Sequence, residues 1–312
     1  MNVNIVETLR EASISALFIP MGFSTSFPMW VEKVNELAGA RTPRQIMDLG
    51  DHLAEIFAQT RTTGRSQSEV SGGGAAWESL VCWYLNFCLI GRRTVVIKHN
   101  KTLIPSPISD AITVNYNSFA SNTESDLVAI TFPNSQNYAI DRERIAILDE
   151  NGAQVPLTSG RQYNRKGVMN ALCNRDFSNI EIHVIQCKTN WNDNAQIPML
   201  WDMVYSANTF TQNITIGRNG YSIRDTRRFT YSFVTVPTSR MDGINPASTC
   251  VKRVNQISGG NYWGKPSVSA VASSVKEMLN RNLATGHESS HLVTLGAELH
   301  KLGDEYSYFR LL

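Results

Sequence analysis

The sequence predicts a mixed α/β protein, of the α/β or α+β class, with a sheet core flanked by helices and a helical N-terminal region. Over the first ninety residues, apolar side chains recur at helical spacing. Between residues 93 and 237, short β-rich runs alternate with turn residues. Helical patterns then return within and after that region. Helices followed by strands with interspersed helices are typical of this class.

The N-terminal helices are predicted from apolar periodicity and from capping residues. Thr42 is expected to cap a helix whose first position is Pro43, because a proline needs no N–H partner there. A polar, glycine-rich stretch over residues 61–74 interrupts the pattern. We expect helices over Val3–Phe18, over Pro28–Ala40, from Thr42 to Phe57 and over Ala75–Leu89.

The central region is predicted to form the sheet. We expect strands at Thr94–Lys98, Ala111–Tyr116, Asp126–Phe132, Arg144–Leu148, Ile180–Lys188 and Phe229–Val236. Further helices are expected at Ala195–Ala207, at Val268–Leu283 and over about 288–302. The glycines at 72–74 suggest a division into a helical region, 1–72, and a core region, 73–312, although both can belong to one continuous domain.

Composition narrows the class of protein. The chain has 312 residues, of which 42% are hydrophobic, so it can bury a core and is not expected to be disordered. Its longest apolar run, Leu80–Ile90, is too short to span a bilayer, and Glu7 and Arg10 interrupt any signal peptide. The odd count of five cysteines favours reduced thiols and a cytoplasmic location. A net charge of +2 gives no bulk attraction to nucleic acid, so any such binding needs local clusters.

Three polar residues at predicted strand ends suggest a catalytic site. Asp126 stands at the start of one apolar strand, whereas Gln186 and Lys188 stand at the end of another. Side chains alternate along a strand, so Gln186 and Lys188 project from the same face. If the two strands are neighbours, the three groups meet at one sheet edge. A carboxylate and a second oxygen ligand can hold Mg²⁺, and a lysine beside them can stabilise a phosphate under attack.

The segments SDLVAI and IQCKTNWNDNAQIPMLWDMVY resemble the PD-(D/E)xK nuclease superfamily, and within it the type II restriction endonucleases. This resemblance implies a restriction-endonuclease-like fold, with Asp126 as a metal ligand, Gln186 as a second ligand and Lys188 as the catalytic lysine. Glu78, in the helix AAWESLV, matches a glutamate at the edge of such sites. Asp176 is a rival for the aspartate role.

The resemblance also implies partners. It implies a Mg²⁺-dependent endonuclease acting on double-stranded DNA, a homodimer if the target is palindromic, and a cognate DNA methyltransferase. Side-chain amides can read base edges, and arginines can follow the phosphate backbone. The expected DNA-contacting residues are Asn190, Asn192, Asn194, Arg218, Arg224, Arg227 and Arg228.

A motif near the C-terminus supports a different function. His287-Glu288-Ser289-Ser290-His291 matches H-E-x-x-H, which on a helix places two histidines on one face to bind Zn²⁺ for peptide hydrolysis. A zinc metallopeptidase would need a third ligand nearby. A non-catalytic DNA-binding protein is the other alternative, and it would keep the basic clusters while holding Asp126 and Lys188 apart.

Overall fold

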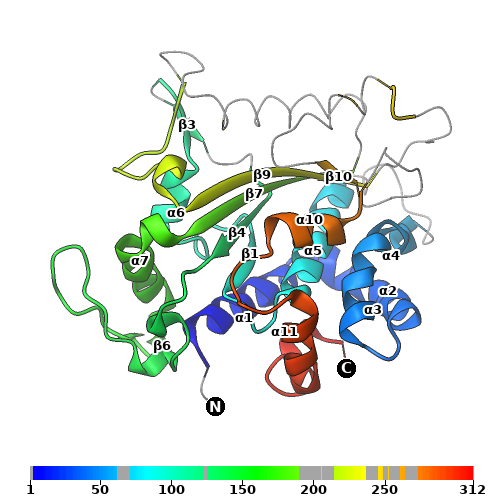
Figure 1. Ribbon diagram of the computed structural model, residues 1–312, viewed down its shortest axis with the longest axis horizontal. Helices are drawn as coiled ribbons and strands as arrows, with labels where there is room; N and C mark the ends of the chain where they lie inside the picture. The colour runs from blue at the N-terminus through cyan, green and yellow to red at the C-terminus, as the bar shows by residue number, and fades with distance from the viewer. Residues whose placement is uncertain are drawn as a thin grey trace.

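The computed structural model describes residues 3–61, 71–117, 119–121, 125–189, 205, 214–236, 245–248, 252, 261–263 and 273–311 (Figure 1). Its centre is a five-stranded mixed sheet, as the sequence predicts. The strands lie in the order β1 (Thr94–Lys98), β4 (Leu127–Thr131), β7 (Glu181–Lys188), β9 (Arg228–Thr235) and β10 (Asn261–Trp263).

The strand directions divide the sheet into two parts. β1, β4 and β7 form an antiparallel meander, whereas β9 runs parallel to β7 and β10 parallel to β9. The smaller sheets consist of β3 (Phe119–Ser121), β2 (Val114–Tyr116) and β8 (Ile214–Ile216), and of β5 (Thr158–Ser159) and β6 (Gln162–Tyr163).

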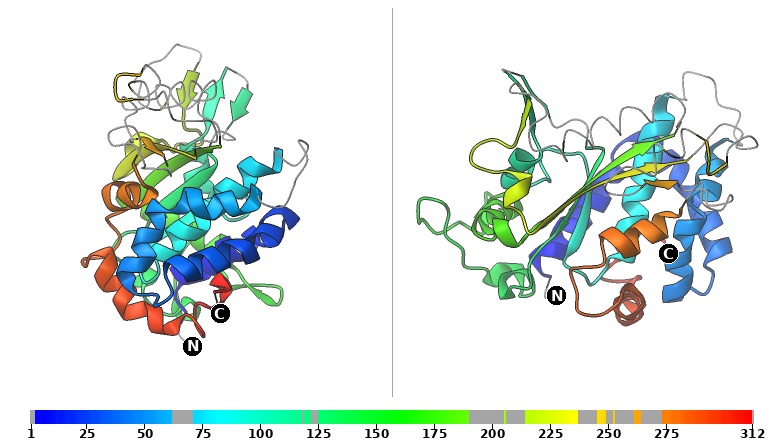
Figure 2. Two further views of the ribbon diagram at one scale, coloured as in Figure 1. Left: turned by 90° about the vertical axis from the view of Figure 1, so that its right-hand side faces the viewer. Right: turned by 45° about the horizontal axis from the view of Figure 1, so that its top comes forward.

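Helices cover both faces of the main sheet (Figure 2). The described helices are α1 (Ile5–Leu17), α2 (Met21–Leu37), α3 (Pro43–Asp48), α4 (Leu53–Ala58), α5 (Ser71–Cys88), α6 (Ser106–Ala111), α7 (Arg165–Arg175), α10 (Val275–Asn282) and α11 (His291–Glu298). Short 3₁₀ segments lie at Leu49–Asp51, Gln59–Arg61, Gln136–Tyr138, Arg142–Arg144, Phe177–Asn179, Ile223–Asp225, Leu299–Lys301 and Ser307–Phe309. No single described helix is long and apolar enough to cross a membrane, while α1 and α2 together pass that test but meet at 99°.

Helix α5 is the central element of one buried core. Its apolar segment from Leu80 is buried throughout and packs with α2 and with the face of the sheet that carries Ile185 and Cys187. A second core on the opposite face contains Ile182 and Val184 together with side chains of α7. Because successive strand residues alternate between these two cores, β7 is buried on both faces, as its continuous apolar run predicts.

The outer edge of β1 is covered by side chains from two helices. Asn86 of α5 donates to the Val96 carbonyl at 2.7 Å and accepts from the Val96 N–H at 3.0 Å. Ser13 of α1 donates to the same carbonyl at 2.8 Å, and the buried Arg10 donates to the Thr94 carbonyl at 2.9 Å. These side chains satisfy main-chain groups that a sixth strand would otherwise have to pair, so the edge is closed within the chain.

Several predicted elements are confirmed. The bounds of β1 are the predicted ones, and those of β7 and β9 differ by one residue from the prediction at one or both ends. The predicted cap at Thr42 is a full capping box, in which Thr42 and Gln45 bond to each other's main-chain N–H groups. The expected helix Ala195–Ala207 lies outside the described residues apart from Tyr205.

Other predicted elements are wrong. The second helix begins at Met21 and contains Pro28 in its interior, because Phe23 and Phe27 bury their rings there and extend the apolar face. The run predicted as a strand at Arg144–Leu148 forms no ladder. Its isoleucines are buried, and Leu148 makes only an isolated bridge with Gln154. The sequence interpretation also missed helix α7.

Candidate functional site

The ends of three strands meet at one end of the main sheet. β1 ends there with Lys98, β4 begins there after Asp126, and β7 ends there with Lys188. The register places Lys98 opposite Leu127, and Leu127 opposite Ile185. The arrowheads of β7 and β9 point toward the side of the molecule where α5 lies (Figure 1). The antiparallel meander therefore gathers these strand ends as the sequence interpretation requires.

Asp126 lies directly beside the end of β7. Its carboxylate oxygen Oδ2 accepts a hydrogen bond of 2.7 Å from the main-chain N–H of Cys187, the residue between Gln186 and Lys188. Its main-chain carbonyl accepts from the N–H of His99 at 2.9 Å, just beyond β1. Asp126 thus joins the ends of β1 and β7, and its carboxylate is bound by the residue that precedes Lys188 in the chain.

Glu78 reaches the same edge from α5, through an ion pair that the sequence interpretation did not foresee. Its Oε2 lies 3.2 Å from the Nζ atom of Lys98, and both side chains are partly exposed. Lys98 is not among the site residues that the sequence pattern predicts. Its position at the end of an adjacent antiparallel strand was the available signal, since such strand ends share an edge.

The electrostatic surroundings of Cys187 show how closely these charges gather. Burial raises the pKa of the Cys187 thiol, and the Asp126 and Glu78 carboxylates raise it further. The ammonium groups of Lys188 and Lys98 act on the Cys187 pKa in the opposite direction. The charges of two acidic and two basic side chains therefore act on one buried thiol, and their formal charges balance.

Gln186 is not brought to Glu78. It is fully buried, and its Oε1 accepts a hydrogen bond from the Tyr231 hydroxyl of β9. Cys187 packs in the α5 core, so the alternation of β7 directs Gln186 to the opposite face. Gln186 was expected to be a metal ligand beside Asp126, whereas in the structure the Tyr231 hydroxyl occupies its Oε1 atom. Gln186 instead ties β7 to its parallel neighbour.

The predicted arginine cluster does not surround Lys188. Arg227 and Arg228 lie 3.7 and 3.9 Å from the buried Glu181 carboxylate, at the start of β7. Glu181 and Lys188 are seven residues apart along a strand, or about 23 Å. Asp176 also precedes the start of β7 and pairs with Arg175 at 2.6 Å, so it is no rival to Asp126.

The remaining predicted DNA contacts divide into two groups. Arg218 pairs with Asp110 at 2.6 Å, while Arg224 is exposed beside Ser222, whose hydroxyl accepts from the Arg224 N–H. Asn190, Asn192 and Asn194 lie outside the described residues. Three of the four arginines, Arg218, Arg227 and Arg228, thus lie within 4 Å of an acidic side chain of the same chain.

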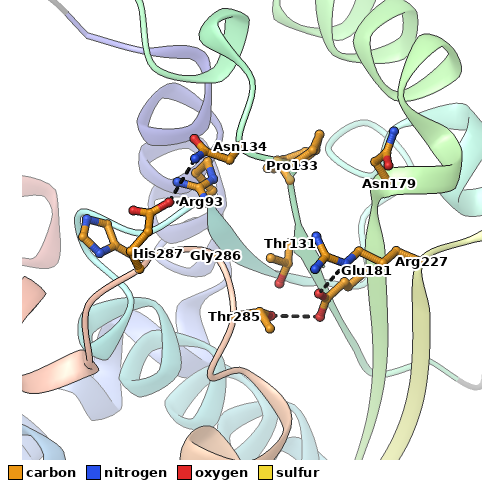
Figure 3. Close-up of a pocket in the computed structure, with 12 residues that line it drawn as sticks. Arg93, Thr131, Pro133, Asn134, Asn179, Glu181, Arg227, Thr285, Gly286 and His287 are labelled. Atoms are coloured by element: carbon orange, nitrogen blue, oxygen red, sulfur yellow. Dashed lines mark hydrogen bonds and ion pairs between the residues drawn. The ribbon is translucent and has the colours of Figure 1, made fainter.

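A polar pocket of about 270 Å³ opens at the Glu181 end of the sheet (Figure 3). The Thr285 hydroxyl donates to Glu181 Oε2 at 2.8 Å on one side. On the other side, Asn134 donates to Glu288 Oε1 at 2.9 Å, and Arg93 lies 3.7 Å from the same oxygen. The charged residues that line this pocket are thus paired with one another.

The H-E-x-x-H segment does not form the predicted zinc site. His287 and Glu288 lie in a loop, and α11 begins only at His291, so the two histidines do not share a helical face. His287 Nδ1 accepts from the Ser289 N–H at 2.9 Å, and the buried His291 ring lies 3.1 Å from the Leu283 carbonyl. Within the described ranges, no group of three His, Cys, Asp or Glu side chains is arranged to hold a metal.

Comparison with known proteins adds nothing to these assignments. No protein-family model matches the sequence. No curated protein matches it either. The candidate roles of Asp126, Glu78 and Lys188 therefore follow from the sequence pattern and from the geometry of the sheet edge.

Proposed function

We propose that this protein is a Mg²⁺-dependent DNA endonuclease that hydrolyses phosphodiester bonds at the end of the sheet where Asp126 lies beside the strand that ends at Lys188, and which Glu78 approaches from α5. The hydrogen bond from the Cys187 N–H to Asp126 Oδ2 is the observation that carries the proposal, because it holds a carboxylate one residue from the lysine. The antiparallel meander of β1, β4 and β7 supports the proposal, because it places the strand that follows Asp126 beside the strand that ends at Lys188.

The donors at this edge fit a magnesium ion. Mg²⁺ takes oxygen ligands, keeps several waters and is held in many enzymes by one or two carboxylates together with substrate phosphate. Asp126 and Glu78 would supply the carboxylates, and the partial exposure of Glu78 leaves access for water and phosphate. When bound, the ion polarises phosphate and lowers the pKa of a bound water. Gln186 is left out of this ligand set because it is fully buried and its Oε1 atom accepts a hydrogen bond from Tyr231.

The chain's own residues supply orientation and positive charge. The Cys187 N–H fixes the Asp126 carboxylate, so little reorganisation is needed when a substrate arrives. Lys188 provides a cation beside the scissile phosphate. Among the described residues, no carboxylate forms an ion pair with its ammonium group. In the reaction, water bonds to phosphorus through its oxygen, the bridging P–O bond breaks, and the departing oxygen gains a proton.

The finer assignment is a type II restriction enzyme with a sequence-specific target, and it rests on the sequence resemblance. A palindromic target would be matched by a two-fold homodimer, because the symmetry of the protein then mirrors that of the site. A cognate methyltransferase would protect the host DNA in such a system.

The test is cleavage of unmethylated phage DNA by the wild type and by Lys188→Ala, with Mg²⁺ and with EDTA. We expect discrete fragments that require Mg²⁺, and a loss of about 100-fold or more in rate for Lys188→Ala. Lys33→Ala, on α2 and paired with Glu36, is the matched control and should cleave normally. Equal cleavage by Lys188→Ala, or none by folded wild type on several DNAs with Mg²⁺ or Mn²⁺, would refute the proposal.

A further inference from the structure

We infer that Lys98 is a positioning residue of this site and acts as a built-in counter-ion that competes with a divalent cation for Glu78. The inference rests on the proposed function, because it assigns a metal-binding role to the Glu78 carboxylate. It concerns a residue that the nuclease pattern does not include.

The contacts of Lys98 show a side chain held in one place. Its ammonium donates to the Ala75 carbonyl at 2.7 Å and to the Ser79 hydroxyl at 3.0 Å, and it lies 3.2 Å from Glu78 Oε2. An ammonium has three donors, so these three α5 groups saturate it. Lys98 therefore links the end of β1 to one turn of α5 and fixes where Glu78 points.

The position of Lys98 places this pair at the Asp126 edge. Lys98 lies opposite Leu127 in the β1–β4 register, and Leu127 directly follows Asp126 in the chain. Its charge acts on the Cys187 pKa together with the charges of Asp126 and Glu78, so all of these groups share one electrostatic environment. The exposed fractions of the Lys98 and Glu78 side chains are 27% and 21%, so water and small ions can reach both.

Competition with a metal follows from charge. Two carboxylates without a metal repel each other, and Lys98 offsets that repulsion while the site is free of metal. A divalent cation that bound Glu78 would have to replace Lys98 as its partner. The Ala75 carbonyl and Ser79 hydroxyl would still hold the ammonium nearby, where it repels the incoming cation. Lys98 therefore weakens metal binding and simultaneously keeps Glu78 aimed at the site.

The test is titration of the DNA-free protein with Mn²⁺ in a calorimeter. Lys98→Met removes the charge but keeps the length of the side chain, and we expect it to bind Mn²⁺ about fivefold more tightly, the value of a partly exposed ion pair. Asp126→Asn should bind Mn²⁺ at least about tenfold more weakly. Lys33→Met, which breaks an exposed pair with Glu36 elsewhere, should match the wild type.

A double-mutant cycle with Glu78→Gln separates competition from structural damage. In the Glu78→Gln background, Lys98→Met should no longer tighten Mn²⁺ binding, because the contested carboxylate is gone. If Lys98→Met fails to fold, Lys98→Gln serves instead, since its amide can still donate to the Ala75 carbonyl. A purely structural role for Lys98 would weaken metal binding in either variant.

The outcomes distinguish the two proposals. Unchanged or weaker Mn²⁺ binding by Lys98→Met, with weak binding by Asp126→Asn, overturns the role of Lys98 and leaves the nuclease site standing. If Asp126→Asn, Glu78→Gln and Lys33→Met all bind as the wild type does, the metal site itself is wrong and the proposed function fails with it.

Discussion

Replacing Asn86 by leucine tests whether the edge of β1 is closed by side chains. Asn86 is fully buried, and its amide makes both a donor and an acceptor bond to Val96. Leucine has the same branching and the same number of side-chain heavy atoms but can make neither bond. The Val96 N–H would then be buried without an acceptor, while its carbonyl would still be paired with Ser13. An unsatisfied buried N–H and the loss of these bonds cost about 3 kcal/mol, and the more apolar leucine offsets about 1 kcal/mol.

The expected result for Asn86→Leu is therefore a loss of about 2 kcal/mol in the free energy of unfolding. Urea unfolding followed by tryptophan fluorescence measures it, since Trp77 and Trp83 on the same helix are buried. Asn35→Leu, on the exposed face of α2, is the control and should change stability by less than about 0.5 kcal/mol. A loss no larger than that of Asn35→Leu would refute the view that Asn86 closes the sheet edge.

Two further predictions concern the C-terminal loop. The buried Arg92 donates to the carbonyls of Ser289, Ala284 and Thr285 at 2.8, 2.5 and 3.2 Å. Arg92→Met should therefore lower the free energy of unfolding by about 3 kcal/mol and speed amide hydrogen exchange over residues 284–290. Unchanged exchange in these residues would contradict the prediction. Burial lowers the pKa of His291 to about 4, and the Arg92 charge acts the same way. Because the unfolded chain takes up this proton near pH 6.5, His291 stabilises the fold above that pH. As the pH falls from 6.5 toward 4, the free energy of unfolding decreases by about 1.4 kcal/mol for each pH unit. The urea midpoint should therefore fall less between pH 7 and pH 5 for His291→Gln than for the wild type. An equal fall for both proteins would contradict the lowered pKa of His291.

The features that sequence predicted well depend on local signals or on strand alternation. β1 is a run of β-branched residues between turn residues, so its bounds could be predicted without knowing its partners. The meeting of Asp126 and Lys188 required only that their strands be antiparallel neighbours. The predicted shared face of Gln186 and Lys188 follows from the same alternation. Which core that face meets depends on the side of the sheet where α5 packs, and no local pattern contains that information.

The features that sequence predicted poorly depend on contacts between distant segments. His287 to His291 has the spacing of a helical metal motif, but Gly286 has a φ of 92° and its carbonyl accepts from the Arg93 N–H. Arg92 holds the neighbouring carbonyls. Two adjacent arginines nearly 200 residues upstream thus keep this segment as a loop. Likewise, Arg227 appeared free to bind DNA only because its partner Glu181 lies on another strand.

The two ends of β7 differ in what their charges are available to do. At the start of the strand, Glu181 is buried, accepts from Thr285 and lies between Arg227 and Arg228, so the arginines there neutralise an internal acid. DNA phosphate would have to compete with that carboxylate for them. At the end of the strand, Lys188 is partly exposed and stands one residue from the peptide that binds Asp126. Phosphate can approach this lysine without displacing a buried carboxylate. The charge distribution along a single strand therefore favours the Lys188 end for binding a phosphodiester, with the Glu181 end acting to anchor the C-terminal loop.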